Sequence, residues 1–294
     1  MSSRPIIPKF KKTRKALREP VWAVADVLTR PTASWRVLPD YLIIGAQRAG
    51  TTSLQDVLTT HPNVTSARLM KGVHYFDTAY PKGMAWYQAH FPTKRAAARR
   101  QASTGAPLRV GEASPYYIFH PKAVERIAAD LPGVKLILLL RDPVERTISH
   151  HKHESRRGNE TLSLEAALDA EPGRLAGEAE KVAADPSYNS FPLQTYSYAA
   201  RSHYAPQVRR LFSLVDREKV LILPSERFFD EPGATFSAIL DFLEVPEFRP
   251  DAFPQMNATK TDAIPTQVIE RLRGDFRQPN EELFELLGER YPWQ

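Results

Sequence analysis

The chain of 294 residues contains no cysteine. Disulfide bonds, thiolate catalysis and cysteine-ligated zinc or iron–sulfur sites are therefore excluded, which fits a reducing compartment. No stretch reaches the roughly 18 consecutive apolar residues that a membrane-spanning helix needs. The hydrophobic content of 42% allows a sizeable core. We therefore expect a globular protein located in the cytoplasm.

Acidic charge is scarce at the start of the chain. Residues 1–36 carry nine Lys/Arg against Glu19 and Asp26, whereas the other 258 residues carry 31 basic and 32 acidic side chains. The formal net charge of +6 is thus concentrated in one arm, and we expect no nucleic-acid-binding fold. The apolar run 21–28 is interrupted by Asp26, so it is not typical of a secretion signal. We expect a solvated basic N-terminal arm over 1–36, with peripheral contact to an anionic membrane surface as the alternative.

Apolar runs and turn signals alternate along the rest of the chain. The run at 135–140 is continuous rather than alternating, as in the buried strands of a parallel sheet. We predict strands at 41–45, 109–112, 135–140 and 219–223, a short extended piece at 73–76, and helices at 52–60, 84–90, 122–131, 143–157, 232–243 and 265–288. Residues 158–198 are rich in turn signals, and we expect them to be a loop that covers the substrate. The pattern predicts one α/β domain over 37–294, a P-loop-like parallel sheet flanked by helices.

Residues 41–53 combine an apolar strand, a turn with two glycines and the start of a helix. Gly45 and Gly50 have the spacing of a Walker A loop, G-x-x-x-x-G-K-[ST], but Thr51 occupies the lysine position. Glycines let backbone N–H groups approach an anion, and the first helical turn adds unpaired N–H donors. Arg48 supplies a cation. The hydroxyl donors of the segment are Thr51, Thr52 and Ser53. The segment therefore predicts a site for a phosphate-like group.

The missing lysine separates two enzyme classes. A nucleotide kinase needs that lysine, a Mg²⁺ ion held by a hydroxyl group, and an acidic residue after a second strand. Here Arg141 follows the strand 135–140 directly. We therefore expect an anion to be held without a metal. His150 and Glu154 have the i, i+4 spacing of metal ligands, but no third ligand motif accompanies them.

A second anion site is predicted after the strand 135–140. Arg141 stands at the carboxyl end of this strand, where ligands of open α/β sheets bind. Ser149 follows eight residues later, about two helical turns, so it shares a face with the start of the helix. Two phosphate-sized sites together describe a nucleotide phosphorylated at both ends. The simpler interpretation is that Arg141 pairs with Asp142 or Glu145.

The combination of these motifs resembles the sulfotransferases that use 3′-phosphoadenosine 5′-phosphosulfate (PAPS), in particular bacterial members and the heparan-sulfate branch. Residues 42–54 are similar to the 5′-phosphosulfate loop of that family, and residues 141–149 to its 3′-phosphate motif. Further similar segments are Lys71–Asp77, Gly111–Tyr117, Arg201–Tyr204, Ser225–Phe229 and Asn257–Lys260. The resemblance covers roughly residues 40–262, and it implies an enzyme that uses PAPS as co-substrate.

The resemblance also implies roles for individual residues. Arg48 would replace a catalytic lysine and contact the bridging oxygen and the sulfuryl group. The residues implied to bind the donor are Gln47, Arg48, Ala49, Gly50, Thr51, Thr52, Ser53, Arg141, Ser149 and Lys260. Two positions depart from the heparan-sulfate branch, since Gly72 replaces its glutamate base and Ala113 replaces a lysine.

An acceptor still needs a general base, which typically contributes about 10²–10⁴-fold to the rate. His74 is the first candidate, because it titrates near neutrality and Asp77 or Glu112 can orient it. Glu112 itself is the second candidate. We expect sulfuryl transfer to a hydroxyl or amine of a small molecule, lipid or carbohydrate. The alternatives are a metal-dependent P-loop nucleotide kinase and a non-catalytic nucleotide-binding protein, which Gly72 allows. The sequence identifies neither the acceptor nor the oligomeric state.

Overall fold

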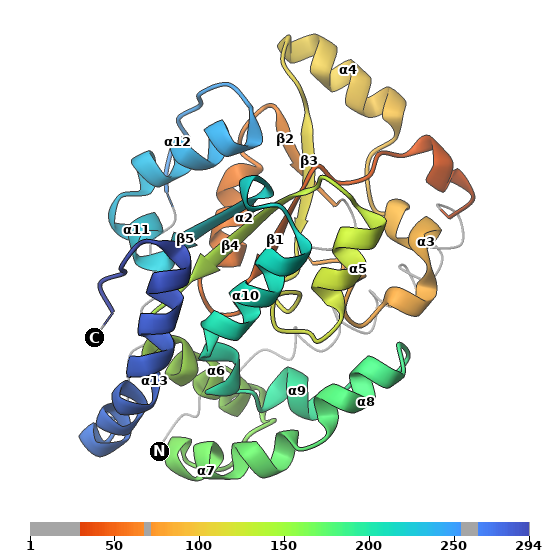
Figure 1. Cartoon of the computed structure of the whole chain (residues 1–294). Coiled ribbons are helices and arrows are strands. Elements are labelled where there is room, and N and C mark those ends of the chain that lie inside the picture. Colours follow the sequence, from red (N-terminus) through yellow and green to blue (C-terminus); the bar gives the residue numbers. More distant parts are fainter. Residues whose placement is uncertain (1–29, 68–71, 254–263, 294) are drawn as a thin grey trace, which may run out of the picture.

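The computed structural model describes residues 30–67, 72–253 and 264–293. Within these ranges, five parallel strands form one sheet in the order β2-β3-β1-β4-β5 (Figure 1). The strands are β1 (Tyr41–Gly45), β2 (Val64–Ser66), β3 (Arg109–Ala113), β4 (Lys135–Leu140) and β5 (Val220–Pro224). Helices flank this sheet, so the predicted fold class is confirmed.

The helices lie on both sides of the sheet and beyond the carboxyl ends of its strands (Figure 1). They are α2 (Thr51–Leu58), α3 (Met84–Gln88), α4 (Lys94–Thr104), α5 (Ala123–Asp130), α6 (Pro143–Arg157), α7 (Leu164–Leu175), α8 (Glu178–Ala184), α9 (Phe191–Thr195), α10 (Tyr204–Leu214), α11 (Ser225–Asp230), α12 (Pro232–Leu243) and α13 (Thr266–Leu287), with the 3₁₀ turns η1 (Arg30–Trp35), η2 (Tyr80–Lys82), η3 (Ala200–Ser202) and η4 (Arg217–Lys219). Among the described residues, no helix has both the length and the apolar character to cross a membrane.

The strand β1 lies at the centre of the sheet. All of its residues are buried, and it pairs with β3 on one side and β4 on the other. In β4, Leu136 to Leu140 are buried as well. Strands that are covered on both faces are apolar at successive positions, which explains the continuous apolar runs of these two segments.

The order of the strands fixes where a ligand binds. From β1 the chain moves to β2 and β3 on one side, then crosses to β4 and β5 on the other. The loops after β1 and β4 therefore leave the carboxyl edge next to each other, at the topological switch point. A hydrogen bond from the Ala46 N–H to the Leu139 carbonyl oxygen (2.6 Å) joins the two at this edge.

A second, smaller apolar cluster positions α6 against α7 and α13. Its buried members include Val144, Ile148, Leu168, Leu272 and Phe276. Asp142 caps α6 by accepting a hydrogen bond from the Glu145 N–H (2.9 Å). The cap and the cluster together fix the helix that carries the predicted second anion site.

The segment 158–198 differs from the predicted loop, because it folds into α7, α8 and α9. Pro172 and Gly173, which belong to the turn signals of this segment, lie inside α7. The carboxylate of Glu171 accepts hydrogen bonds from the N–H groups of Ala199 and Ala200, each 2.8 Å long. These tertiary contacts outweigh the local turn preference of the Pro-Gly pair. Residues 73–76 also differ, since they contain no strand, and Tyr75 and Phe76 begin a turn.

Candidate active site

The loop 46–50 turns the chain from β1 into α2. Gly50 has a φ of 90°, a left-handed conformation that glycine adopts without strain. A Cβ at this position would lie 2.9 Å from Cζ of Phe229. Ser225 Oγ donates a hydrogen bond to the Ala49 carbonyl oxygen (2.8 Å). The helix α11, which carries both side chains, therefore supports the loop from behind.

The start of α2 is arranged to receive an anion. No side chain among the described residues caps the helix, so the N–H groups of its first turn are available to a ligand. Thr51, Thr52 and Ser53 form this turn, and Thr52 is exposed whereas Thr51 is buried. The helix dipole favours negative charge at the same point. The start of α2 therefore presents uncapped backbone N–H groups and three hydroxyl side chains, and binding of an anion there stays a prediction.

Arg48 connects this cradle to the second predicted anion site. Its Nε donates a hydrogen bond to Ser149 Oγ (3.1 Å). Its carbonyl oxygen accepts a hydrogen bond from Nη1 of Arg141 (3.3 Å). Arg141 also contacts the exposed Glu145 (3.2 Å), as the simpler interpretation expected, although it does not pair with Asp142. The structure thus brings Arg48, Arg141 and Ser149 together at the switch point.

Positive charge is concentrated around the loop. Burial lowers the pKa of Arg48 most, and the positive charges of Arg156 and Arg141 lower it further, whereas Glu154 opposes them in part. Arg48 forms no ion pair among the described residues. Such a group of cations favours a bound anion, which fits a phosphosulfate and a second phosphate.

Sequence reasoning missed Arg156 as a member of this group. It lies seven residues after Ser149 on α6, which is about two helical turns and therefore the same face. This spacing was the available signal. The positive charge also affects His153 on the same helix. Burial is the larger cause and the charge of Arg48 the second cause that lowers the pKa of His153.

Gln47 is held by a buried arginine. Nη1 of Arg201 donates a hydrogen bond to Gln47 Oε1. The guanidinium group of Arg201 lies over the rings of Tyr116 (4.7 Å) and Phe119 (4.9 Å), and burial lowers its pKa to about 10. Nη2 of the same group donates to the Leu193 carbonyl oxygen of α9. Arg201 therefore links the loop after β1 to the segment that was predicted to cover the substrate.

Of the other residues predicted to bind the nucleotide, some lie within the described part of the chain and some lie outside it. Ala49 is buried in the loop, where its carbonyl oxygen is bound by Ser225 as described above. Lys260 and the segment Asn257–Lys260 lie outside the described residues, as does Lys71. The predicted closure of the site by Lys260 therefore stays a prediction.

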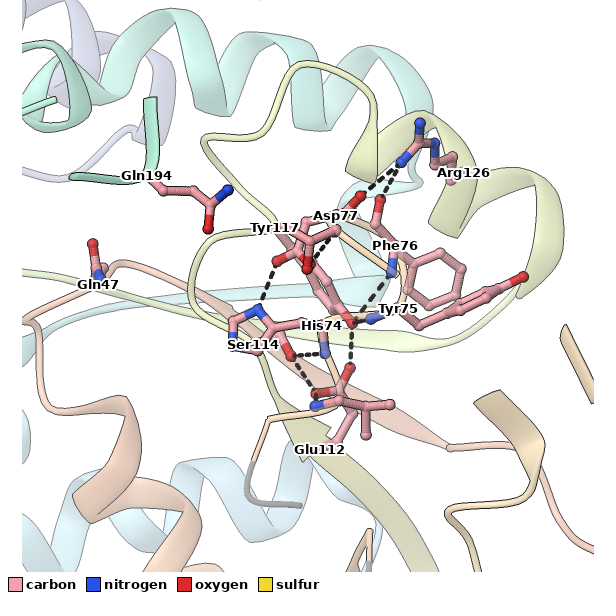
Figure 2. A network of polar contacts seen from close by, with 12 residues as sticks. Gln47, His74, Tyr75, Phe76, Asp77, Glu112, Ser114, Tyr117, Arg126 and Gln194 are labelled. Carbon is pink, nitrogen blue, oxygen red and sulfur yellow. Dashed lines mark hydrogen bonds and ion pairs between the residues drawn. The ribbon is translucent and has the colours of Figure 1, made fainter. Parts of the chain in front are cut away.

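His74 lies on a turn across the site from the loop (Figure 2). Its Nδ1 is 2.8 Å from Oδ2 of the fully buried Asp77, and its own side chain is 42% exposed. The backbone N–H of His74 donates to Ser114 Oγ (2.9 Å). Burial lowers the pKa of His74, but the hydrogen bond and the charge of Asp77 outweigh it, so the pKa is raised. The Nε2 atom is thus the one that remains for an acceptor.

Glu112 lies beneath the turn that carries His74 (Figure 2). Its side chain is fully buried and accepts hydrogen bonds from Tyr117 OH (2.8 Å), Ser114 Oγ (2.7 Å) and the Val73 N–H (3.3 Å). Burial raises the pKa of this carboxyl group. These contacts tie the carboxylate to the backbone of the turn and to Ser114 and Tyr117.

The position of Gly72 explains how the turn accommodates an imidazole. A Cβ at residue 72 would lie 2.7 Å from the Ala113 carbonyl oxygen and 3.2 Å from Nε2 of His74. The ring of His74 therefore occupies the space into which a side chain at position 72 would extend. The resemblance places the family's glutamate base at that position, and here the titratable atom in this space belongs to His74.

Aromatic and cationic side chains hold the turn rigidly. Nη1 of Arg126 donates to the carbonyl oxygens of Phe76 (2.8 Å) and Asp77 (3.1 Å), as Figure 2 shows. The ring of Tyr75 stacks on Tyr87 at 4.7 Å. These aromatic residues are buried in the core, so they do not line an open cleft. In the same view Gln47 and Gln194 lie on the other side of the site from His74.

Among the residues that the structure describes, no three His, Asp or Glu side chains gather into a set that could hold a metal ion. His150 is buried and packs against the ring of Tyr198 at 5.1 Å. Glu154 accepts a hydrogen bond from Asn159 Nδ2 (2.6 Å). His150 and Glu154, the pair with i, i+4 spacing, are therefore each in contact with a neighbouring side chain of the fold.

Comparisons with known proteins point to one family. A family model described as "Sulfotransferase family" matches residues 39–250. The chain is 25% identical to a membrane-associated sulfotransferase, kil1, of Dictyostelium discoideum, over 87% of this chain and 67% of that protein. It is 27% identical to mouse heparan sulfate glucosamine 3-O-sulfotransferase 3B1, over 89% of this chain and 66% of that protein.

A solved structure gives the same indication. The crystal structure of a sulfotransferase from Alicyclobacillus acidocaldarius matches with a TM-score of 0.64 and 28% identity, covering 87% of this chain and 98% of that one. The chain spans about two thirds of the length of the two curated relatives.

Proposed function

Because the chain belongs to the sulfotransferase family, we propose that it transfers the sulfuryl group of PAPS to a hydroxyl or amine of an acceptor by in-line displacement. The family match confirms the resemblance that the motifs indicated. The observation that carries the proposal is the hydrogen bond from Arg48 to Ser149, because it unites two anion subsites that were predicted separately. A donor with one phosphate and one phosphosulfate group fits such a pair.

PAPS supplies an activated sulfuryl group on its 5′-phosphate and a separate 3′-phosphate. We assign the first turn of α2 to the 5′-phosphosulfate, and Arg141 and Ser149 to the 3′-phosphate. Arg48 lies between the two and stabilises charge on the sulfuryl oxygens during transfer. The unbalanced positive charge around Arg48 supports this assignment.

The acceptor side of the proposal rests on His74. Its Nε2 would take the proton of the attacking hydroxyl while Nδ1 stays bonded to Asp77. The buried carboxylate of Asp77 fixes the tautomer and stabilises the imidazolium that forms, as in other histidine–carboxylate pairs. Glu112 would then position the turn instead of acting as a base. This set of roles accounts for the absence of a glutamate at position 72.

A carbohydrate is the acceptor class that we place first within this proposal. Several relatives are named for heparan sulfate, which supports a sugar hydroxyl or amine. The nucleotide kinase alternative is not favoured, because Thr51 replaces the lysine that a kinase needs. The proposal also includes a cytoplasmic location, on the ground that the chain has no cysteine for disulfide bonds.

Thermal-shift titration tests the donor assignment. We expect adenosine 3′,5′-bisphosphate to raise the melting temperature without metal, and Arg141→Ala to remove most of the shift. The control variant Arg277→Ala changes an exposed arginine on α13 and should keep the full shift. Stabilisation by ATP with Mg²⁺ but not by the bisphosphate would overturn the proposal.

Transfer itself is measured with radiolabelled PAPS and a panel of glucosamine oligosaccharides, phenols and lipid alcohols. We expect label to be transferred to one class of acceptor, and His74→Ala to abolish the transfer while leaving the bisphosphate shift intact. A protein that binds the bisphosphate but transfers no label to any of them, or to water, would support the non-catalytic alternative.

A further inference from the structure

Exposed cations gather on one surface, which is formed by η1, η2 and the first two turns of α4. We call this surface the basic face, and its exposed side chains are Arg30, Trp35, Lys82, Lys94, Arg95 and Arg99. The two segments that build it, 30–39 and 78–108, contain seven Lys/Arg and no Asp or Glu. Trp35 is 66% exposed, the largest value among the exposed large hydrophobic side chains of the described residues.

Direct contacts show that this surface is continuous. Nη2 of Arg30 donates a hydrogen bond to the Lys82 carbonyl oxygen (3.1 Å), which joins η1 to η2. Nζ of Lys94 donates to the Ser34 carbonyl oxygen (2.8 Å), which joins α4 to η1 beside Trp35. In Figure 1, η1, α3 and α4 lie on the same side of the sheet. The basic face is therefore one patch made of segments distant in sequence.

The cations of the basic face differ from many others on the protein. None of the five has a carboxylate within ion-pair distance in the described part of the chain, whereas elsewhere Arg174, Lys135 and Arg290 are paired with glutamates. Unpaired charges of one sign on one surface create a positive potential that attracts an anionic partner. The partner must therefore be anionic and broad enough to cover several elements.

The sequence that precedes Arg30 is also basic. Residues 1–29 contain seven Lys/Arg, and they include the apolar run 21–28 with a tryptophan at position 22. Their last residue is joined to Arg30, and so the arm enters the described structure at the basic face. Clustered Lys/Arg with Trp and a short apolar run is the composition of surfaces that bind anionic bilayers. A nucleic acid would be attracted by the positive charge, but it has no apolar interior into which the apolar run 21–28 could insert.

The basic face is not an extension of the acceptor site. The start of α4 lies beside the segment that leads into the amino end of β1, because Thr93 and Arg36 form an antiparallel β-bridge. The loop with Arg48 and the turn with His74 lie at the opposite, carboxyl edge. A partner held at α4 thus leaves the proposed active site open. We propose that the basic face docks this protein on an anionic lipid bilayer.

Vesicle sedimentation with the full chain tests the proposal. We expect binding to phosphatidylcholine vesicles that contain 30% phosphatidylglycerol, no binding to phosphatidylcholine alone, and loss of binding as salt rises to about 0.5 M. Each Lys or Arg near such a surface contributes about fivefold to the binding constant. The triple variant Lys94→Ala, Arg95→Ala, Arg99→Ala should therefore bind about 100-fold more weakly. Alanine is the best helix former, so the fold is expected to be retained, which circular dichroism checks.

A matched control removes the same charge elsewhere. The variant Lys181→Ala, Arg249→Ala, Arg277→Ala changes three exposed cations of α8, the 244–253 segment and α13. It should bind anionic vesicles nearly as well as the unchanged protein. An equal loss in both triple variants would show that net charge or the arm alone carries binding, and would overturn the assignment to this face.

Two further results discriminate the partner. Trp35→Ala should weaken binding to anionic vesicles at low salt without changing how steeply binding falls with salt. Binding to single- or double-stranded nucleic acid, with none to anionic vesicles, would overturn the lipid proposal and assign the face to a different partner. Binding to neutral and anionic vesicles alike would also overturn it.

Discussion

Arg48 and Ser149 are 101 residues apart in sequence, yet Nε of Arg48 donates a 3.1 Å hydrogen bond to Ser149 Oγ. The bond connects the loop after β1 to α6, which follows β4. No carboxylate among the described residues pairs with Arg48, so the guanidinium group can exchange the hydroxyl for an oxygen of the donor. Arg48 is thus placed to contact both halves of a nucleotide that spans the switch point.

Arg48 should affect the rate more than it affects donor binding. We expect Arg48→Ala to lower kcat by about 10²–10³-fold, the usual cost of removing one donor that stabilises transition-state charge. Arg48→Lys should recover part of the loss, because the resemblance places a lysine there. Steady-state kinetics with varied PAPS measure both constants. A kcat that stays within about threefold in Arg48→Ala would remove this residue from catalysis.

Arg141 should affect donor affinity more than rate. Loss of a charge-assisted hydrogen bond in Arg141→Ala should weaken binding of adenosine 3′,5′-bisphosphate by about 10–100-fold in calorimetry. Stability should change little, because the contact with Glu145 is exposed. Glu145→Ala is the matched control, and it should bind the nucleotide at least as well as the unchanged protein. Equal affinities in all three proteins would contradict the 3′-phosphate assignment.

The pH dependence of turnover should report His74. The base must be neutral, and Asp77 raises the pKa of His74 above its ordinary value of about 6.5, so kcat should fall as pH decreases through that raised pKa. Asp77→Asn should move this limb to lower pH and also reduce the plateau, because the amide favours the wrong tautomer. A limb unchanged in Asp77→Asn would contradict this pair.

The buried carboxylate of Glu160 should stabilise the segment that includes α7 to α9. It is hydrogen-bonded by Arg174, by Tyr198 OH (2.9 Å) and by the N–H groups of Thr161 and Leu162. Burial raises its pKa, but these hydrogen bonds outweigh burial and hold the pKa at about 2. The stabilisation should be complete above the unfolded pKa of about 4.5 and be lost as pH falls toward 2.

Urea unfolding measures this effect. Glu160→Gln should lower the free energy of unfolding by about 3 kcal/mol at pH 7 and by less at pH 3. The control Glu281→Gln breaks an exposed pair with Arg290 and should leave the free energy of unfolding nearly unchanged. A loss for Glu160→Gln no larger than that of the control would show that this network does not stabilise the segment.

Apolar runs and helix-end residues in the sequence were enough to predict some of the strands and helices correctly. The strands β1 and β4 have the predicted bounds, because a short continuous apolar run is stable only where both faces of the strand are covered, as in the centre of a parallel sheet. The helix α6 also has its predicted bounds, since Pro143 and Gly158 mark its ends. By contrast, α7 was missed, because its Pro-Gly pair is a turn signal that the contacts of Glu171 outweigh.

The site shows the same division. The donor loop was recognisable because its glycines, hydroxyl groups and cation lie within nine residues of sequence. The sequence did not reveal the burial of Glu112 or the hydrogen bond from Arg201 to Gln47. Both depend on contacts between segments that only the fold brings together. Membership of Arg156 in the charge cluster required the length and direction of α6. The roles of these residues remain predictions that the variants above test.

The close approach of position 72 to its neighbours ties the identity of this residue to the geometry of the whole turn. A Cβ there would lie 2.7 Å from the Ala113 carbonyl oxygen and 3.2 Å from Nε2 of His74. A side chain at 72 is therefore accommodated only if the turn moves away from β3 or the imidazole shifts. Gly72→Glu adds a carboxylate, but it is expected to displace the ring of His74 from its 2.8 Å contact with Asp77.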